Sequence, residues 1–119
     1  MVKLRRVLLV QLPIPPAGLD PVPGNVPLAA AYLNLFARRQ GLERHYQIDL
    51  FSVTLANTLG DQALIEAILA AEPKIVGFSC YLWNVERSLW IADQLTRRRP
   101  ELVILVGGPE VTPDNRLVL

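Results

Sequence analysis

The sequence predicts an α/β fold in which a parallel sheet is covered by helices on both faces. Short runs of branched apolar residues alternate with amphipathic segments along the chain, which is the order of strands and crossover helices. The clearest unit spans residues 74–108, where an apolar run, an amphipathic segment and a second apolar run follow one another. Hydrophobic residues make up 51% of the chain, which is enough for strands buried on both faces.

The composition is that of one domain without disulfides. A length of 119 residues suffices for a single domain with its own core. Cys80 is the single cysteine, which excludes an internal disulfide and any cluster or zinc site built from several thiolates. The net charge of +1 gives no field to attract nucleic acid, and no apolar run reaches the ~18–20 residues of a membrane helix. We therefore expect a cytoplasmic protein that binds neither nucleic acid nor membrane.

The first strand is expected at residues 6–12 (RVLLVQL), because Pro13, Pro15 and Pro16 end the run. Residues 13–25 hold five of the ten prolines and show no periodicity, so we expect a long, stiff loop. Loops of this length in compact domains are usually functional or disordered.

The first helix is expected to follow Asn25 as its N-cap, with Pro27 in the first turn and Gly41 just past its end. Its apolar residues recur at helical spacing. The face expected to pack on the sheet consists of Leu28, Ala31, Tyr32 and Leu35.

Next come a predicted second strand and a second helix. Residues 46–53 (YQIDLFSV) read as the strand. Asp61 is the candidate N-cap of the helix, which ends before Pro73. The buried stripe of this helix is expected to be Leu64, Ile68 and Ala71.

The third strand is predicted at residues 75–79, and its unbroken apolar character indicates a central position covered on both sides. In the helix that follows, Trp90 points away from the apolar face, and Trp83 shares its side if the helix starts early. An exposed tryptophan pair would indicate an interface. The apolar face of this helix is expected to be Val85, Ser88, Leu89, Ala92 and Leu95.

The fourth strand is predicted at residues 102–106, and Asp114 or Asn115 is placed to cap a helix beginning at Arg116. Four strands joined by helices predict a flavodoxin-like, doubly wound (Rossmann-like) sheet of order 2-1-3-4 that stops before a fifth strand. We therefore expect residues 1–119 to be one domain that is a fragment of a longer polypeptide.

In a sheet of this order, ligands bind at the carboxyl ends of the first and third strands. The loops expected there contain a hydroxyl, a phenol, carboxamides and an indole, with no cluster of acids or bases. We therefore predict binding rather than acid–base catalysis, with neither catalytic residues nor a metal site. The candidate binding residues are Pro13, Gly24, Asn25, Ser79, Tyr81, Trp83, Asn84, Gly107, Gly108, Pro109 and Glu110.

Three phosphate-type motifs are absent. No GxGxxG follows the first strand, and no GxxxxGK[ST] occurs in the chain. The paired acids and the aspartate of response regulators are also missing, because Gln11 and Ser79 stand near those positions. The glycine pair at 107–108 is weak evidence alone, since a strand ending in GGP is a common tight turn.

The run PKIVGFSCYLWNVERSLWIADQLTRRRPELVILVGGPEVT closely resembles the N-terminal cobalamin-binding domain of radical SAM enzymes. This group includes B12-dependent methyltransferases and the anaerobic magnesium-protoporphyrin monomethyl ester cyclase, and the similarity extends weakly to VPLAAAYLNLFARRQG. The resemblance implies that Ser79 hydrogen-bonds the base of the cobalamin nucleotide tail and that Tyr81 takes the apolar position of a Ser-x-Leu element. It also implies that Gly107 and Gly108 let the backbone approach the tail closely.

Two departures from related families bear on the cofactors. The methionine-synthase type of domain carries Asp-x-His-x-x-Gly after its first strand, whereas this loop has no histidine, and His45 is expected at the opposite edge. The resemblance therefore implies cobalamin bound without a protein histidine. No Cys-x-x-x-Cys-x-x-Cys occurs, so SAM and a [4Fe-4S] cluster are expected only in a downstream radical SAM domain, the implied partner. Cys80 is expected to be a small core residue.

Three functions remain open from the sequence. The first is a cobalamin-binding domain, or a degenerate version of one, serving methyl transfer or a cyclase-type step of a radical SAM enzyme. The second is a cofactor-free, flavodoxin-like interaction domain that docks a partner through Trp83 and Trp90. The third is a flavin or nucleotide binder at the same edge of the sheet.

Overall fold

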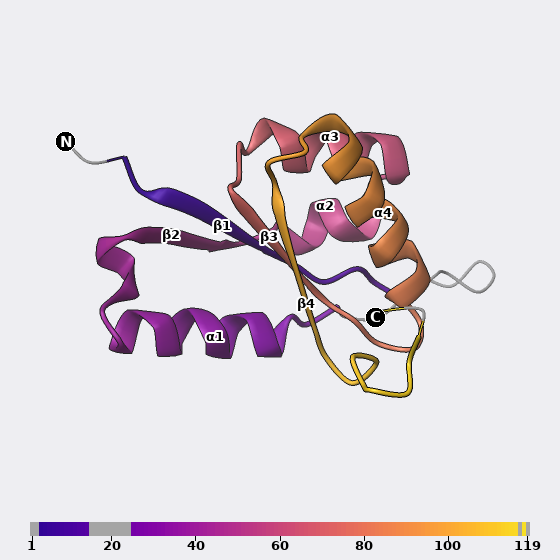
Figure 1. The fold of residues 1–119 in the computed structure, drawn as a ribbon, viewed down its shortest axis with the longest axis horizontal. Coiled ribbons are helices and arrows are strands. Elements are labelled where there is room, and N and C mark those ends of the chain that lie inside the picture. The colour runs from indigo at the N-terminus through magenta and orange to yellow at the C-terminus, as the bar shows by residue number, and fades with distance from the viewer. Residues whose placement is uncertain (1–2, 15–24, 117, 119) are drawn as a thin grey trace.

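The computed structural model describes residues 3–14, 25–116 and 118, which form a layered α/β domain (Figure 1). Its sheet has four parallel strands in the order β2-β1-β3-β4, which confirms the predicted flavodoxin-like arrangement. The strands are β1 (Arg5–Val10), β2 (Tyr46–Leu50), β3 (Ile75–Ser79) and β4 (Val103–Gly107). The predicted third strand is confirmed, whereas β1 ends two residues before its predicted end and β4 is shifted by one residue.

The helices divide between the two faces of the sheet. One face carries α1 (Leu28–Arg39), which leads through the short 3-10 helix η1 (Leu42–Arg44) into β2. The other face carries α2 (Val53–Thr58), α3 (Asp61–Ala70) and α4 (Val85–Arg98), as Figure 1 shows. None of the described helices has the length and apolar character that crossing a membrane requires.

The main core lies between the sheet and α3–α4. Strands β1 and β3 direct alternate side chains into it, because successive residues of a strand point to opposite faces. The helices close it with branched side chains at helical spacing. Its most buried members are Val10, Leu12, Leu64, Ile65, Ile68, Val76, Ile91 and Leu95.

Helix α1 contacts the sheet through small residues, so the predicted packing face is wrong. Its buried residues are Ala30 and Ala37, whereas Leu28, Tyr32 and Leu35 are 59–65% exposed. The helix is apolar on almost every side, so periodicity alone could not select the inner face. Alanine side chains let the helix lie close to the sheet, and the large residues consequently point away from it.

The start of α1 also differs from the prediction, and its end agrees. Pro27 occupies the N-cap position and no side chain caps the helix, because the Asn25 amide is bonded to Gln11 instead. The chain leaves the helix at Gly41, whose φ of 75° is the left-handed conformation expected just past a helix end.

The predicted strand at 46–53 is too long, because a short helix replaces its end. Helix α2 begins at Val53, and the Ser52 hydroxyl accepts a hydrogen bond from the Leu55 N–H at 3.2 Å. Serine at an N-cap stops the strand by offering this local bond. Asp61 is the first residue of α3 rather than its cap, and the cap position belongs to Gly60.

Helix α4 agrees with its predicted face except that Ile91 is fully buried and Leu89 only partly. Trp90 is 48% exposed, as expected. Trp83 stacks on Tyr81 and precedes the helix, which begins at Val85, so the early helix start that would align Trp83 with Trp90 does not occur. Residues 109–116 make turns, and no helix begins at Arg116 within the described part of the chain.

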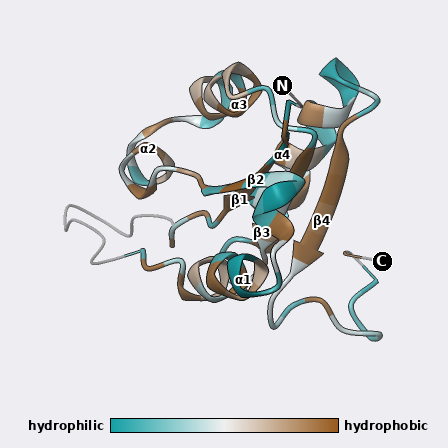
Figure 2. Cartoon of the chain, turned by 90° about the vertical axis from the view of Figure 1, so that its left-hand side faces the viewer, coloured by the Kyte–Doolittle hydropathy of each residue, from teal (hydrophilic) through white to brown (hydrophobic). Residues whose placement is uncertain are grey.

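Strand β4 is covered on one face only, which corrects the expectation of strands buried on both sides. Val103 and Leu105 are 48% and 53% exposed on the α1 side, whereas Ile104 and Val106 pack against the core. Figure 2 shows β4 as an apolar strand on the outside of the domain. The α1 side of β3 and β4 is consequently the open part of the sheet.

Candidate functional site

The carboxyl ends of β3 and β4 bring the predicted serine and glycine pair together. Ser79 and Gly107 are register partners in the parallel ladder. The Cys80 N–H donates to the Gly107 carbonyl at 2.6 Å, and the Glu110 N–H donates to the Cys80 carbonyl at 3.2 Å. The two turns therefore share one rim of the sheet, which is the juxtaposition expected from the sequence.

Gly108 is required by the fold of this rim. Its φ is 101°, and a Cβ at this position would lie 2.5 Å from the Cys80 carbonyl oxygen and 2.8 Å from the Cys80 nitrogen. A backbone neighbour cannot move aside as a flexible side chain could. Gly108 therefore lets the turn after β4 pack on the turn after β3.

Gly107 has a different effect, because a Cβ built on it meets no atom within 4 Å. The missing side chain leaves open space on the exposed side of the rim. Of the two glycines, Gly107 is consequently the one that leaves room for a guest.

A groove of about 340 Å³ extends from this rim along the α1 side of the sheet. Its volume is at the lower end of the range typical of small-molecule sites. Among the described residues that line it, none has a charged side chain, and the serine hydroxyl is the one polar side-chain group. The groove is lined by Leu9, Ala29, Ala30, Leu33, Gly77, Phe78, Ser79, Leu105, Val106, Gly107 and Gly108.

Two small residues keep the groove open. Gly77 lies in the middle of β3 and is buried, and a Cβ there would come within 2.9 Å of the Leu9 Cδ2 atom. Ala30 brings α1 close to the sheet without filling the space beside it. The Ser79 hydroxyl makes no hydrogen bond to any described residue, so it is available to a guest as donor or acceptor.

Asn84 organises the rim rather than facing the groove. Its side chain is 1% exposed, and its Nδ2 atom donates to the carbonyls of Leu12 at 2.9 Å and Ser79 at 3.1 Å. Its Oδ1 atom accepts from the Tyr81 N–H at 2.8 Å. These bonds tie the ends of β1 and β3 together and use both amide hydrogens.

Tyr81 and Trp83 form a stacked pair on the loop after β3. Their ring centroids are 4.8 Å apart with an interplanar angle of 5°. Neither residue lines the groove, so the groove is not filled by these rings. Trp83 is 46% exposed and Leu82 is 78% exposed, which gives the loop an apolar outer surface.

Two amide side chains, Gln11 after β1 and Asn25 before α1, are hydrogen-bonded to each other's residue. Gln11 Nε2 donates to Asn25 Oδ1 at 2.9 Å, and Asn25 Nδ2 donates to the Gln11 carbonyl at 2.8 Å. The Gln11 Oε1 atom is buried and has no hydrogen-bond partner among the described residues. Pro13 is half-buried, and Gly24, a predicted binding residue, lies outside the described residues.

Pro109 and Glu110 lie in the turn after the glycine pair. Pro109 is exposed, and Asn115 donates to the Glu110 carbonyl at 2.8 Å. Cys80 is completely buried, and this burial, with a smaller contribution from the Glu110 carboxylate, raises the pKa of its thiol. The thiol therefore stays protonated at neutral pH, as the predicted core role requires.

His45 lies at the opposite rim of the sheet, where its carbonyl accepts from the Arg5 N–H at the start of β1. Within residues 3–14, 25–116 and 118, no three His, Cys, Asp or Glu side chains come together as a metal site.

The groove walls were missed by the sequence-based prediction. Leu9, Ala29, Leu33 and Leu105 read as ordinary apolar residues of a strand or helix, and their meeting depends on the tertiary packing of α1. One signal was present, since a glycine inside an apolar strand often marks a close approach by a ligand or another chain segment. That residue is Gly77.

The arrangement defines a class of protein: a doubly wound α/β domain with a neutral, apolar groove and one unpaired hydroxyl at the rim. Such a groove has the character of a site for a flat, uncharged group, and none of the described residues that line it carries an acid or a base. The chain belongs to the B12 binding domain family, because the model of that family matches residues 24–119.

Two curated proteins are similar to this chain. One is the cobalamin-dependent radical SAM methyltransferase TokK of Streptomyces tokunonensis, 30% identical over 101 residues. The other is 2-(S-pantetheinyl)-carbapenam-3-carboxylate methyltransferase of Streptantibioticus cattleyicolor, 32% identical over 101 residues. Each match covers 82% of this chain and 14% of the relative, so the chain spans a small part of these proteins.

Proposed function

We propose that this domain binds cobalamin and holds the base of its nucleotide tail in the groove between α1 and β3–β4. The carrying observation is that Ser79 and Gly107 are register partners at the mouth of an apolar groove of about 340 Å³. A flat aromatic base gains by leaving water for such a groove, and it retains a polar edge that the Ser79 hydroxyl can bond.

The residues present fit this guest. Gly107 leaves open space where a side chain would stand, and the groove carries no charge that a neutral base would have to desolvate.

The domain would hold cobalamin without a histidine below the cobalt. The one histidine of the chain is on the opposite rim, remote from Ser79 in the strand direction. Cobalamin supplies a cobalt centre that can carry a methyl group, and this domain positions it through the tail. We further propose that SAM and a [4Fe-4S] cluster are bound by another domain of the same polypeptide. The name of one relative, a cobalamin-dependent radical SAM methyltransferase, supports this proposal.

The test is a titration of the purified chain with hydroxocobalamin, followed by the visible absorption of the corrin. A Gly107→Val side chain would occupy the open space at the rim and is expected to weaken binding about tenfold or more. Gly60→Val is the matched control, because Gly60 also has open space around its Cβ position but belongs to the start of α3.

Cobinamide, which has the corrin ring and lacks the nucleotide tail, separates the two parts of the proposal. We expect it to bind more weakly and to be insensitive to Gly107→Val. Unperturbed absorption at high protein concentration would contradict cobalamin binding altogether. If Gly107→Val lowered the affinity for cobalamin and for cobinamide equally, the nucleotide tail would not be what the groove binds.

A further inference from the structure

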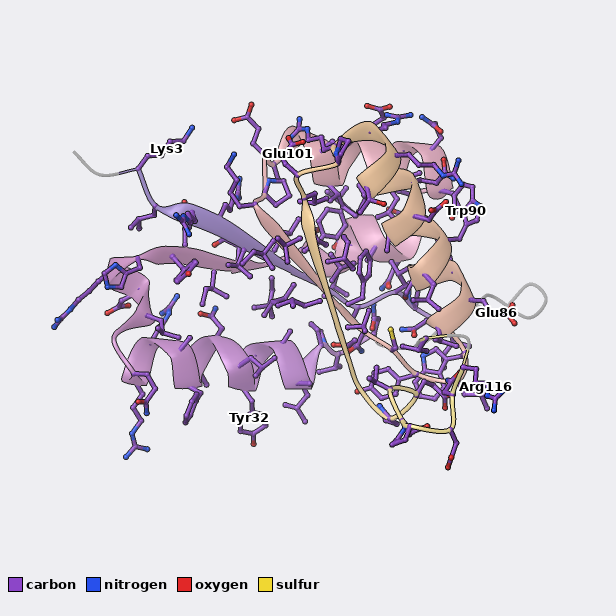
Figure 3. All side chains as sticks on the ribbon, viewed as in Figure 1. Lys3, Tyr32, Glu86, Trp90, Glu101 and Arg116 are labelled. Atoms are coloured by element: carbon purple, nitrogen blue, oxygen red, sulfur yellow. The ribbon has the colours of Figure 1, made fainter. Side chains whose placement is uncertain are left out.

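Helix α1 turns its largest apolar side chains to solvent. Leu28, Tyr32, Leu35 and Phe36 are 59–65% exposed, while the helix buries only alanines. Figure 3 shows Tyr32 pointing away from the sheet. A helix on the surface of a domain normally places polar residues on its outer face, whereas here the outer face is apolar and exposed to solvent. We call these four residues the outer α1 face.

The outer α1 face is continuous and distinct from the groove. At 100° per residue, Leu28, Tyr32 and Leu35 fall within one narrow sector opposite Ala30 and Ala37. Phe36 widens this sector toward β4, while Leu33 belongs to the wall of the groove. Contiguous exposed apolar side chains of this kind mark an interaction surface.

The charges around this face are all positive along the helix. Arg38 and Arg39 close α1, which contains no acidic residue, and neither arginine forms an ion pair with a described residue. The following turn adds one acid, Glu43, and one base, Arg44, so this end keeps a net positive charge. A complementary surface therefore carries carboxylates near the C-terminal end of α1.

A second copy of the chain does not supply this complement. In a two-fold antiparallel pairing of α1 with itself, Arg39 would approach the N-terminal end of the partner's helix. That end carries the positive pole of the helix dipole, and no acidic residue lies in its first turn. The pairing would bury apolar area but would set like charges against each other.

A membrane surface also fits poorly. Helices that lie on membranes carry cations along the polar flanks of a long apolar stripe. Here the two arginines stand at one end, and the rest of α1 carries no charged residue. A protein surface can match an apolar centre with a charge at one end. The matching segment is only 14% of each curated relative, so most of each relative lies outside it.

We propose that the outer α1 face docks a second protein domain whose contact surface is apolar at its centre and acidic beside Arg38 and Arg39. This inference is independent of cobalamin, because none of the four residues lines the groove. The docked domain would leave the rim at Ser79 and Gly107 accessible, since α1 runs away from that rim toward Gly41.

The test uses two synthetic helical peptides with the same leucine and phenylalanine stripe, flanked by glutamates in one and by lysines in the other. We expect the chain to bind the glutamate peptide about tenfold more tightly, by fluorescence anisotropy at low salt. The double variant Tyr32→Gln, Leu35→Gln should abolish this binding while its hydroxocobalamin titration stays unchanged. Trp90→Gln, at a similarly exposed site on α4, is the matched control.

Four results would overturn the proposal. Equal affinity for the two peptides would show that the partner surface need not be acidic. Loss of binding in Trp90→Gln instead would show that the docking surface lies on α4. Sedimentation of the wild type as a dimer that the double variant dissolves would assign the face to a second copy. Binding to phosphatidylcholine–phosphatidylserine vesicles that the double variant loses would assign it to a membrane.

Discussion

Gly107 and Gly108 are neighbours in the chain with opposite surroundings. Gly108→Ala would place a methyl group 2.5 Å from the Cys80 carbonyl oxygen on a left-handed backbone. We expect it to lower the free energy of unfolding by about 2 kcal/mol or more. Gly107→Ala enters open space and should change stability by less than about 1 kcal/mol. Urea denaturation followed by circular dichroism measures both, and equal losses would contradict these separate roles.

Cys80 gives the domain a specific dependence on alkaline pH. Burial raises the pKa of its thiol in the folded chain above the value in the unfolded chain. The folded state therefore holds the proton more tightly, so its contribution to stability is present below pH ~8.5 and is lost as pH rises toward the folded pKa.

We expect the unfolding free energy of the wild type to fall more steeply above about pH 8.5 than that of Cys80→Ala. Urea titrations at several pH values measure this difference. Parallel pH profiles would show that the thiol titrates alike in both states. Alkylation of the native thiol by iodoacetamide at neutral pH should also be slow, because the thiolate is the reactive form.

The role of Asn84 in the site could not be predicted from its residue type and position alone. An asparagine after a central strand is a reasonable ligand contact, and the sequence placed it on the correct rim. Its role depends on Leu12, which is 72 residues away in the chain, because its amide bonds the Leu12 carbonyl. Bonds over such separations cannot be read from local spacing. Ser79 and Gly107, by contrast, were predictable because strand ends in a parallel sheet share one rim.

Among the elements, α2 depends on a single capping side chain. The Ser52 hydroxyl accepts the Leu55 N–H at 3.2 Å, and the helix has only six residues. We expect Ser52→Ala to cost about 1 kcal/mol of stability, with Ser52→Asp close to the wild type. Thermal unfolding by calorimetry checks both variants. A Ser52→Ala protein as stable as the wild type would show that burial of Ala56 alone fixes the helix.

Elements with a single dominant pattern were predicted well, and those with mixed patterns were not. The strand β3 is an unbroken apolar run bounded by Pro73 and a polar turn, and its ends were correct. In α1, small and large apolar residues alternate around the whole helix, so the inner face was misassigned. Whether the small or the large residues face the sheet depends on the distance at which α1 packs on it, and no local sequence pattern encodes this distance.

At the scale of the molecule, β4 is the exposed edge of the described sheet. Its residues are all apolar or glycine, and it lacks the lysine or proline that usually protects an edge strand. We expect the isolated chain to aggregate at high concentration on heating, and Val103→Lys to raise the temperature at which turbidity appears. Leu55→Lys on α2 is the matched control. An equal gain from Leu55→Lys would point to general charge rather than to the edge.

The strand order was the most secure prediction, because the alternation of strands and helices leaves few right-handed topologies. The order places the ligand rim without any knowledge of side-chain packing. The groove below the rim was out of reach, since its walls come from α1 and β4, which do not adjoin in sequence.

Gly77 carries a thermodynamic consequence for the whole domain. A glycine in the middle of a strand gives up about 0.5–1 kcal/mol relative to alanine, and here it lines the groove at a place where a Cβ would come within 2.9 Å of Leu9 Cδ2. A ligand that fills the groove binds the folded chain and not the unfolded one. Well above its dissociation constant, it therefore raises the free energy of unfolding in proportion to the logarithm of its concentration. Ligand occupancy and the unfolding temperature of the domain should therefore rise together, and the protein should unfold at the highest temperature when its ligand is most abundant.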